Sequence, residues 1–166
     1  MMTFTKQVSS ELPSRHTVVL SYHQRVKGRL RITTQQGQDA GILIERGNEL
    51  KHGDKLSDDA GNVLEIYASN ENVSVASTNV PLLFARACYH VGNRHAEVQI
   101  ESDCLIYLRD AVMDDMLRQL GLKVTAGNRP FSPENGAYAK GHSHTHSHSH
   151  SHSHDHDHAD IPGHAG

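Results

Sequence analysis

The sequence predicts an α+β protein in three parts: a small all-β domain over residues 1–70, a mixed domain over residues 71–141 and a disordered histidine-rich tail over residues 142–166. Three observations support this division. Short runs rich in Val, Ile, Leu, Thr and Tyr, separated by glycines, fill the first part. In the second part, similar runs alternate with two segments of helical character. In the third, a histidine occupies every second position from His142 to His158.

Four runs in the first part are predicted to be strands, because their β-branched and aliphatic residues are bounded by turn-forming glycines. In the second run, Arg29 and Arg31 alternate with Leu30 and Ile32. Such alternation indicates a small antiparallel sheet with one solvated face. The four runs are HTVVLSYHQ (16–24), GRLRITT (28–34), DAGILIE (39–45) and GNVLEIYA (61–68).

Basic residues gather around the second of these runs. They could attract an acidic partner or simply form the solvated face of a strand, and we favour the second explanation. The chain has 16 Lys plus Arg and 19 Asp plus Glu, and three of the acids (Asp155, Asp157 and Asp160) lie in the tail, so the net charge before residue 142 is 16 − 16 = 0. A nucleic-acid partner is therefore not expected. The basic residues are Arg25, Lys27, Arg29 and Arg31.

The second part has the order β, α, β, β, α, β, which is the ferredoxin-like arrangement. Pro81 suits the first turn of the first helix, VPLLFARACYHV, and Gly92 is its predicted stop. The second helix, AVMDDMLRQL, is predicted to begin after the N-cap Asp110 and to end at Gly121. Its Val112, Met116 and Leu120 should share one face. The strands are ENVSVAST (71–78), EVQI (97–100), CLIYL (104–108) and LKVTA (122–126), and the turn-rich residues 127–141 should drape over the domain.

Histidine gives the tail its chemistry. Neutral imidazole is the commonest protein ligand for transition metals, and together with carboxylate it suits Ni(II), Zn(II) and Cu(II). The tail has no apolar face to offset the entropy of ordering its backbone, so disorder is predicted. A purification tag is the alternative, but tags are usually uninterrupted histidine runs. The candidate metal ligands are His142, His144, His146, His148, His150, His152, His154, His156, His158 and His164.

Several classes of protein are disfavoured. Cys88 and Cys104 belong to no CxxC pair, so we expect free thiols rather than zinc ligands. The sequence has no run of 18 apolar residues and no signal-peptide core, which favours a cytoplasmic protein without a membrane partner. It has no GxxxxGK[ST], HExxH or GxSxG motif, so we do not expect an enzyme.

Two further histidines, His90 and His95, stand near the predicted end of the first helix, and His95 should project from the turn that follows it. A lone exposed histidine is more often an ordinary surface residue. However, RACYHVGNRH (86–95), DDMLRQLG (114–121) and PFSPENGAY (130–138), followed by the histidine-rich tail, resemble the UreE family of urease accessory proteins.

The resemblance implies a homodimeric nickel metallochaperone with a peptide-binding-like β domain and a ferredoxin-like metal-binding domain. His95, which closes the GNRH motif, corresponds to the family's metal ligand, and two copies would share one Ni(II) ion at the dimer interface. His90 is a candidate accessory ligand, with a structural role preferred. Nickel would be delivered to the urease apoprotein through a complex with the GTPase UreG. Some family members carry an HxH pair before the second helix; LRDA (108–111) stands here, so a second internal site is doubtful.

Two other functions remain open. A buffer that stores or detoxifies Ni(II), Zn(II) or Cu(II) would need only the tail, and the ligand set does not exclude competition by zinc or copper. An RNA-binding module is less favoured, because EVQI and CLIYL lack the paired aromatic residues on which bases stack.

Overall fold

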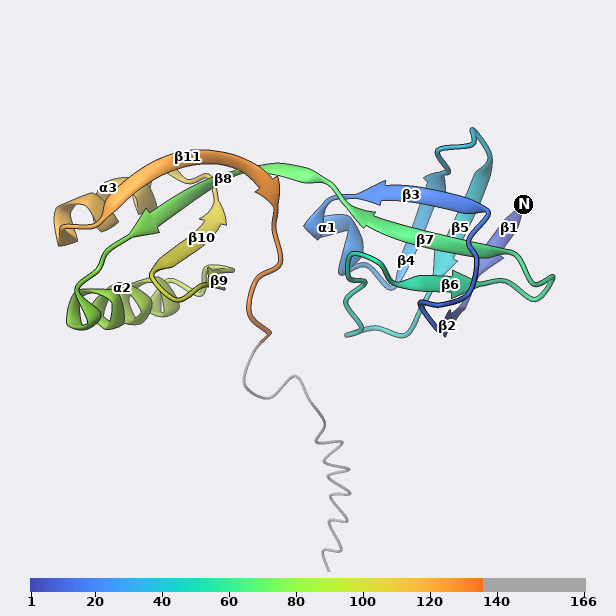
Figure 1. The fold of residues 1–166 in the computed structure, drawn as a ribbon, viewed down its shortest axis with the longest axis horizontal. Coiled ribbons are helices and arrows are strands. Elements are labelled where there is room, and N and C mark those ends of the chain that lie inside the picture. Colours follow the sequence, from blue (N-terminus) through green and yellow to red (C-terminus); the bar gives the residue numbers. More distant parts are fainter. Residues whose placement is uncertain (136–166) are drawn as a thin grey trace, which may run out of the picture.

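The computed structural model describes residues 1–135, which form two lobes lying side by side (Figure 1). We refer to residues 1–69 as the N-terminal lobe and to residues 70–135 as the C-terminal lobe. Within the described residues, no helix is long and apolar enough to cross a membrane. The predicted tail over residues 142–166, with all its candidate ligands, lies outside the described residues.

The N-terminal lobe consists of two small sheets packed on one core. One sheet has the strand order β1-β5-β4 and the other β2-β6-β7-β3. Their inward faces bury a continuous apolar cluster that includes Phe4, Ile42 and Leu64. The strands are β1 (Met2–Phe4), β2 (Lys6–Val8), β3 (His16–Leu20), β4 (Arg29–Thr33), β5 (Asp39–Leu43), β6 (Lys55–Ser57) and β7 (Val63–Ala68).

The prediction of a purely antiparallel first region is wrong. β4 and β5 are antiparallel, as neighbours joined by a short turn must be, but β1 pairs with β5 and β3 pairs with β7 in parallel. β3 and β7 are separated by most of the lobe, so no turn dictates the direction of their pairing. The three-residue strands β1, β2 and β6 are too short to show the alternation from which strands are predicted.

The first predicted strand is also too long. β3 ends at Leu20, and the one-turn helix α1 (Tyr22–Arg25) follows. Ser21 causes the change: its hydroxyl accepts a hydrogen bond from the Gln24 N–H, and the Gln24 side chain accepts one from the Ser21 N–H, which makes a capping box. This turn carries Tyr22 and Arg25 into the interior, so Arg25 is not part of a solvated basic face.

The C-terminal lobe confirms the predicted order of elements. Its sheet has the antiparallel order β11-β8-β10-β9, and helices α2 and α3 lie together on one face (Figure 1). β10 is buried from both sides: Leu105 and Tyr107 pack in the helix-side cluster, whereas Cys104 and Ile106 pack in a second cluster. The elements are β8 (Asn70–Ser77), α2 (Pro81–Asn93), β9 (Gln99–Ile100), β10 (Cys104–Leu108), α3 (Ala111–Leu120) and β11 (Lys123–Pro130).

Helix α3 begins and ends as predicted. The Asp110 carboxylate accepts a hydrogen bond from the Met113 N–H at 2.9 Å, and Gly121 adopts the left-handed conformation with φ of 103°. Of the three residues predicted to share a face, Met116 and Leu120 pack against the core, whereas Val112 is 62 % exposed; Met113 and Leu117 are buried. β11 continues to Pro130, beyond the predicted end at residue 126, because it pairs with the whole length of β8.

The lobes meet where α1 packs against the C-terminal sheet. Tyr22 joins Phe131 in the second cluster, with the two rings edge to face at 5.4 Å. The wholly buried Arg25 forms an ion pair with Glu49 at 3.1 Å and donates hydrogen bonds to the carbonyl groups of Leu50 and Phe131. We call Tyr22, Arg25, Glu49 and Phe131 the joint. Phe131 belongs to the PFSPEN segment, so part of the predicted turn-rich stretch is an anchor between lobes.

Candidate metal centre

His95 lies directly after helix α2, at a sharp turn. The helix does not stop at Gly92 but runs through it to Asn93. Two hydrogen bonds close its end, from Arg94 N–H to the Val91 carbonyl (3.1 Å) and from His95 N–H to the Gly92 carbonyl (3.0 Å). His95 then adopts a φ of 52°, the left-handed conformation that ends many helices. The turn leaves the His95 side chain exposed, as predicted from the sequence.

The His95 imidazole has no side-chain partner within residues 1–135, and no three His, Cys, Asp or Glu side chains in that part of the chain are grouped to hold a metal ion. His52 differs, because its Nδ1 accepts a hydrogen bond from the Ala68 N–H at 3.3 Å. Zinc sites typically have three or four protein ligands. The described residues of one protomer therefore offer His95 as a ligand but do not complete a site around it.

His90 occupies the last turn of α2 and is also exposed. Its ring lies 5.3 Å from the ring of Tyr89 at an interplanar angle of 76°. This contact is consistent with a structural role. In the described chain no third donor joins His90 and His95, so an accessory metal role for His90 stays a prediction.

The described chain ends beside the strand that follows His95. The Glu134 N–H donates to the Val98 carbonyl at 2.8 Å, and the Ser132 N–H donates to the Gln99 side chain at 3.0 Å. Val98 is three residues beyond His95, a span of at most about 11 Å. Nothing in the sequence pattern of PFSPEN predicted this location. The last residues that the structure describes therefore lie near His95.

Helix α2, which ends at this turn, presents large apolar side chains to solvent. Leu82 and Tyr89 are 63 % and 66 % exposed, and they lie seven residues apart, which places them on the same face of the helix. The opposite face is buried through Ala87 and Val91. An exposed apolar face of this kind often marks a protein–protein contact.

The donor groups near the start of α3 are engaged in other contacts or buried. The Asp110 carboxylate is engaged as the N-cap of α3. Cys104 is 7 % exposed, and burial, reinforced by the nearby Glu101 carboxylate, raises the pKa of its thiol. Metal binding requires the thiolate, which a raised pKa disfavours. Both cysteines are free thiols, as predicted, although Cys88 is only partly buried.

Comparison with known proteins identifies the family. Family models of the N-terminal and C-terminal domains of the UreE urease accessory protein match residues 6–69 and 71–158. The chain is 50 % identical over 133 residues to the urease accessory protein UreE of Shewanella halifaxensis, covering 80 % of this chain and 77 % of that protein. It is 46 % identical over 140 residues to the protein of the same name from Citrobacter koseri, covering 84 % and 92 %. The chain belongs to the UreE family of urease accessory proteins.

Proposed function

We propose that this protein is a nickel metallochaperone of the cytoplasm, which carries Ni(II) as cargo and supplies it to the urease apoprotein during assembly of the urease active site. The tightest site would consist of His95 from two protomers sharing one ion, completed by tail histidines, water or a partner. The observation that carries the proposal is the exposed His95 imidazole just after α2, which has no partner among residues 1–135. In this proposal the protein acts as a metal carrier, not as a catalyst.

An incomplete site suits a carrier, because a metal held by few fixed ligands can be passed on. A closed site of four protein ligands holds its metal as a structural element. His95 contributes one imidazole per chain, so the fixed part of the proposed site has two. The remaining coordination positions stay open to exchangeable ligands, including those of the receiving protein.

A homodimer through the C-terminal lobe is supported by the apolar face of α2. Leu82 and Tyr89 lie on the helix that ends at His95. Pairing two such faces about a two-fold axis near the C-terminal end of α2 would bury apolar surface that is otherwise in water and would bring the two His95 turns near each other. The same contact would therefore stabilise the dimer and assemble the shared site.

The tail fits the role of a collector that feeds this site. His142 stands eight residues after Glu134, a chain span of at most about 29 Å, and Glu134 is hydrogen-bonded to Val98 beside the His95 turn. Tethering ligands at such a range gives effective concentrations on the order of millimolar. The linker is therefore long enough for the first tail histidines to reach His95.

One partner is proposed because the sequence lacks a nucleotide-binding motif. It carries no P-loop motif, so nucleotide hydrolysis during delivery would be supplied by the GTPase UreG in the maturation complex. Imidazole and carboxylate do not by themselves select nickel, since Cu(II) generally binds such ligands more strongly. Zinc and copper should therefore compete for binding in vitro, and family membership is the reason to name nickel.

Calorimetric titration with Ni(II), Zn(II) and Cu(II) tests the proposal on four proteins: the full chain, His95→Ala, a chain ending at Gly141, and His23→Ala as a control at another exposed histidine. We expect His95→Ala to lose the tightest site, at one ion per two chains, while most of the weaker capacity survives. The chain ending at Gly141 should show the reverse, and His23→Ala should match the full chain.

A metal buffer that acts through the tail alone is the competing function. It predicts that ending the chain at Gly141 removes all binding and that His95→Ala changes nothing. Urease activation in a reconstituted maturation assay separates the two further. If the protein is a buffer, the chain ending at Gly141 should no longer support activation. Loss of tight binding without loss of activation in His95→Ala would contradict the carrier role of this residue.

A further inference from the structure

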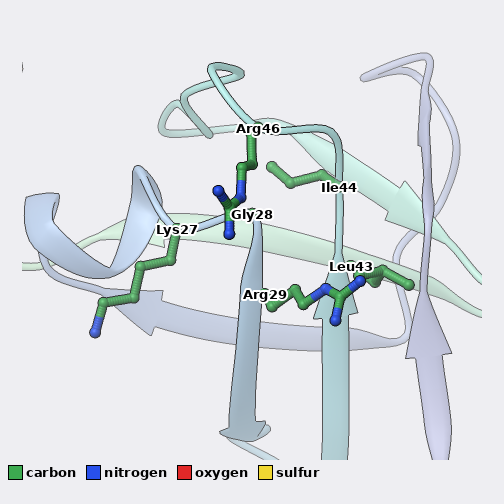
Figure 2. A pocket seen from close by; sticks show the side chains of 6 residues that line it. All are labelled: Lys27, Gly28, Arg29, Leu43, Ile44 and Arg46. Carbon is green, nitrogen blue, oxygen red and sulfur yellow. The ribbon is translucent and has the colours of Figure 1, made fainter.

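A second surface of the molecule, on the N-terminal lobe, carries charge that the nickel role does not use. At the start of β4, a depression is lined by three cationic side chains from two separate stretches of the sequence (Figure 2). Lys27 and Gly28 come just before β4, Arg29 is its first residue, and Arg46 lies in the loop after β5. All three side chains are exposed.

These three cations differ from their neighbours in having no acidic partner. Within residues 1–135, ion pairs are formed by Arg25 with Glu49 and by Arg31 with Asp39, whereas Lys27, Arg29 and Arg46 form none. Glu45 precedes Arg46 in sequence but does not line the depression. Three like charges gathered without compensation repel each other, so the arrangement favours the binding of an anion.

Gly28 allows Arg46 to take its position. A Cβ atom at residue 28 would lie 3.4 Å from Cγ of Arg46 and 3.0 Å from the carbonyl oxygen of Ile44. The Arg46 side chain thus lies over a backbone that has no side chain of its own, with its guanidinium group beside Gly28 (Figure 2). The position of the third cation is built into the fold rather than being a chance extension into solvent.

The basic region continues along the outward face of β4 and β5. Arg29 is opposite Leu43, and Arg31 is opposite Gly41. A second depression lies there and shares Arg29 and Leu43 with the first. Leu43 is 41 % exposed, and Gly41 adds no side chain to the surface. The two depressions together form an elongated surface, with unpaired cations at one end, Arg31 paired with Asp39 toward the other, and the exposed Leu43 between them.

We propose that this surface, lined by Lys27, Arg29, Leu43 and Arg46, docks an extended acidic segment of a partner protein, with carboxylates at the cations and an apolar residue on Leu43. Charge complementarity and elongated shape carry this proposal. It is independent of the nickel site and goes beyond the carrier function.

Shape also disfavours other anions. The Lys27 and Arg29 side chains point away from each other across Gly28 rather than toward one point, so they suit carboxylates spaced along a chain better than one compact phosphate (Figure 2). Single-stranded nucleic acid is held largely by bases stacked on aromatic rings. The residues that line the two depressions include no aromatic side chain.

Fluorescence anisotropy on the metal-free full chain tests the proposal with a labelled peptide of alternating Glu and Leu. Its matched probe has Gln in place of Glu, and a third probe is oligouridine RNA. The variants are Lys27→Gln with Arg29→Gln and Arg46→Gln, and a charge-matched control, Lys6→Gln with Lys51→Gln and Lys123→Gln. The substituted side chains are all exposed, so both variants should fold, which circular dichroism verifies.

We expect the Glu-containing peptide to bind, and the first triple variant to bind it about tenfold more weakly, because each exposed charge pair contributes a few-fold. The control variant should bind like the unchanged protein, and added salt should weaken binding. Three results would overturn the proposal: no binding of the Glu peptide, equal weakening in both variants, or preferential binding of the RNA through the same three residues.

Discussion

The joint between the lobes and the turn that carries His95 differ in how completely their polar groups are partnered. At the joint, Arg25 is wholly buried, and its two terminal nitrogens donate to the Glu49 carboxylate and to the carbonyl groups of Leu50 and Phe131, while only its Nε has no partner in the described residues. At the turn, the His95 backbone is hydrogen-bonded to Gly92, but its imidazole is exposed and has no partner in the described residues.

This difference separates a structural contact, the joint, from a candidate metal-binding residue, His95. A buried charge with several partners keeps two bodies in one arrangement, since removing any partner leaves another uncompensated. An exposed imidazole in a left-handed turn contributes little to stability and keeps its lone pair available for a metal. Substitutions at the joint should therefore lower the stability of the protein, whereas substitutions at the turn should weaken metal binding.

Replacing Arg25 should have the largest effect on stability. Arg25→Ala leaves Glu49, 12 % exposed, without its partner, so we expect a loss of about 3 to 5 kcal/mol in the free energy of unfolding. Urea denaturation of the metal-free protein measures it. Arg31→Ala is the control, because the exposed pair of Arg31 with Asp39 should contribute about 0.5 kcal/mol or less. A similar loss in both variants would contradict the special role of the joint.

Alkaline pH should loosen the joint through Tyr22. Burial, followed by the nearby Glu97 carboxylate, raises the pKa of Tyr22 from 10.0 to about 12. A raised folded-state pKa means that the stabilisation is complete below pH 10 and is lost as pH rises toward 12. We expect Tyr22→Phe to reduce the fall in stability over this range by about 1 to 3 kcal/mol, measured by urea denaturation at a series of pH values. Equal slopes for both proteins would contradict this.

Two substitutions of His95 should differ in stability although both remove the metal ligand. At a φ of 52°, glycine avoids the strain of a Cβ atom, so His95→Gly should be more stable than His95→Ala by about 0.5 to 1 kcal/mol. Thermal unfolding compares the two variants without metal. Both should lack the tightest nickel site. Greater stability of the Ala variant would mean that the left-handed turn is not kept in solution.

The smallest effect concerns the two thiols. Burial raises the pKa of both Cys88 and Cys104, so alkylation near neutral pH should be slow at each. Cys104 packs in the cluster that contains Tyr22 and Phe131, whereas Cys88 packs on the helix side. Arg25→Ala should therefore speed alkylation of Cys104 more than that of Cys88, as followed by mass spectrometry. Equal acceleration would show that the variant loosens the whole C-terminal lobe.

Sequence reasoning succeeded where local signals were strong. The order of elements in the C-terminal lobe could be predicted because Pro81, Asp110 and Gly121 mark helix ends by their own chemistry. The turn at His95 could be predicted because His95 comes directly after a predicted helix. The family could be recognised from three short motifs and the tail.

Features that depend on distant pairing could not be predicted. The parallel pairs of the N-terminal lobe join strands far apart in sequence. Arg25 resembled a solvated basic residue until Ser21 was seen to begin a helical turn and Phe131, more than a hundred residues later, was seen to accept its hydrogen bond. Arg46 was missed for the same reason, because its proximity to Gly28 comes from strand pairing.

The sheet order β11-β8-β10-β9 has a consequence for how the protein is made. Both neighbours of β8 come after it in the chain, so this sheet is complete only once residue 130 has been synthesised. Every strand of the N-terminal lobe lies before residue 69 and can pair earlier. During synthesis, the hydrogen bond from Arg25 to the Phe131 carbonyl can form only after residue 131 has been made, so the contact that joins the two lobes forms late.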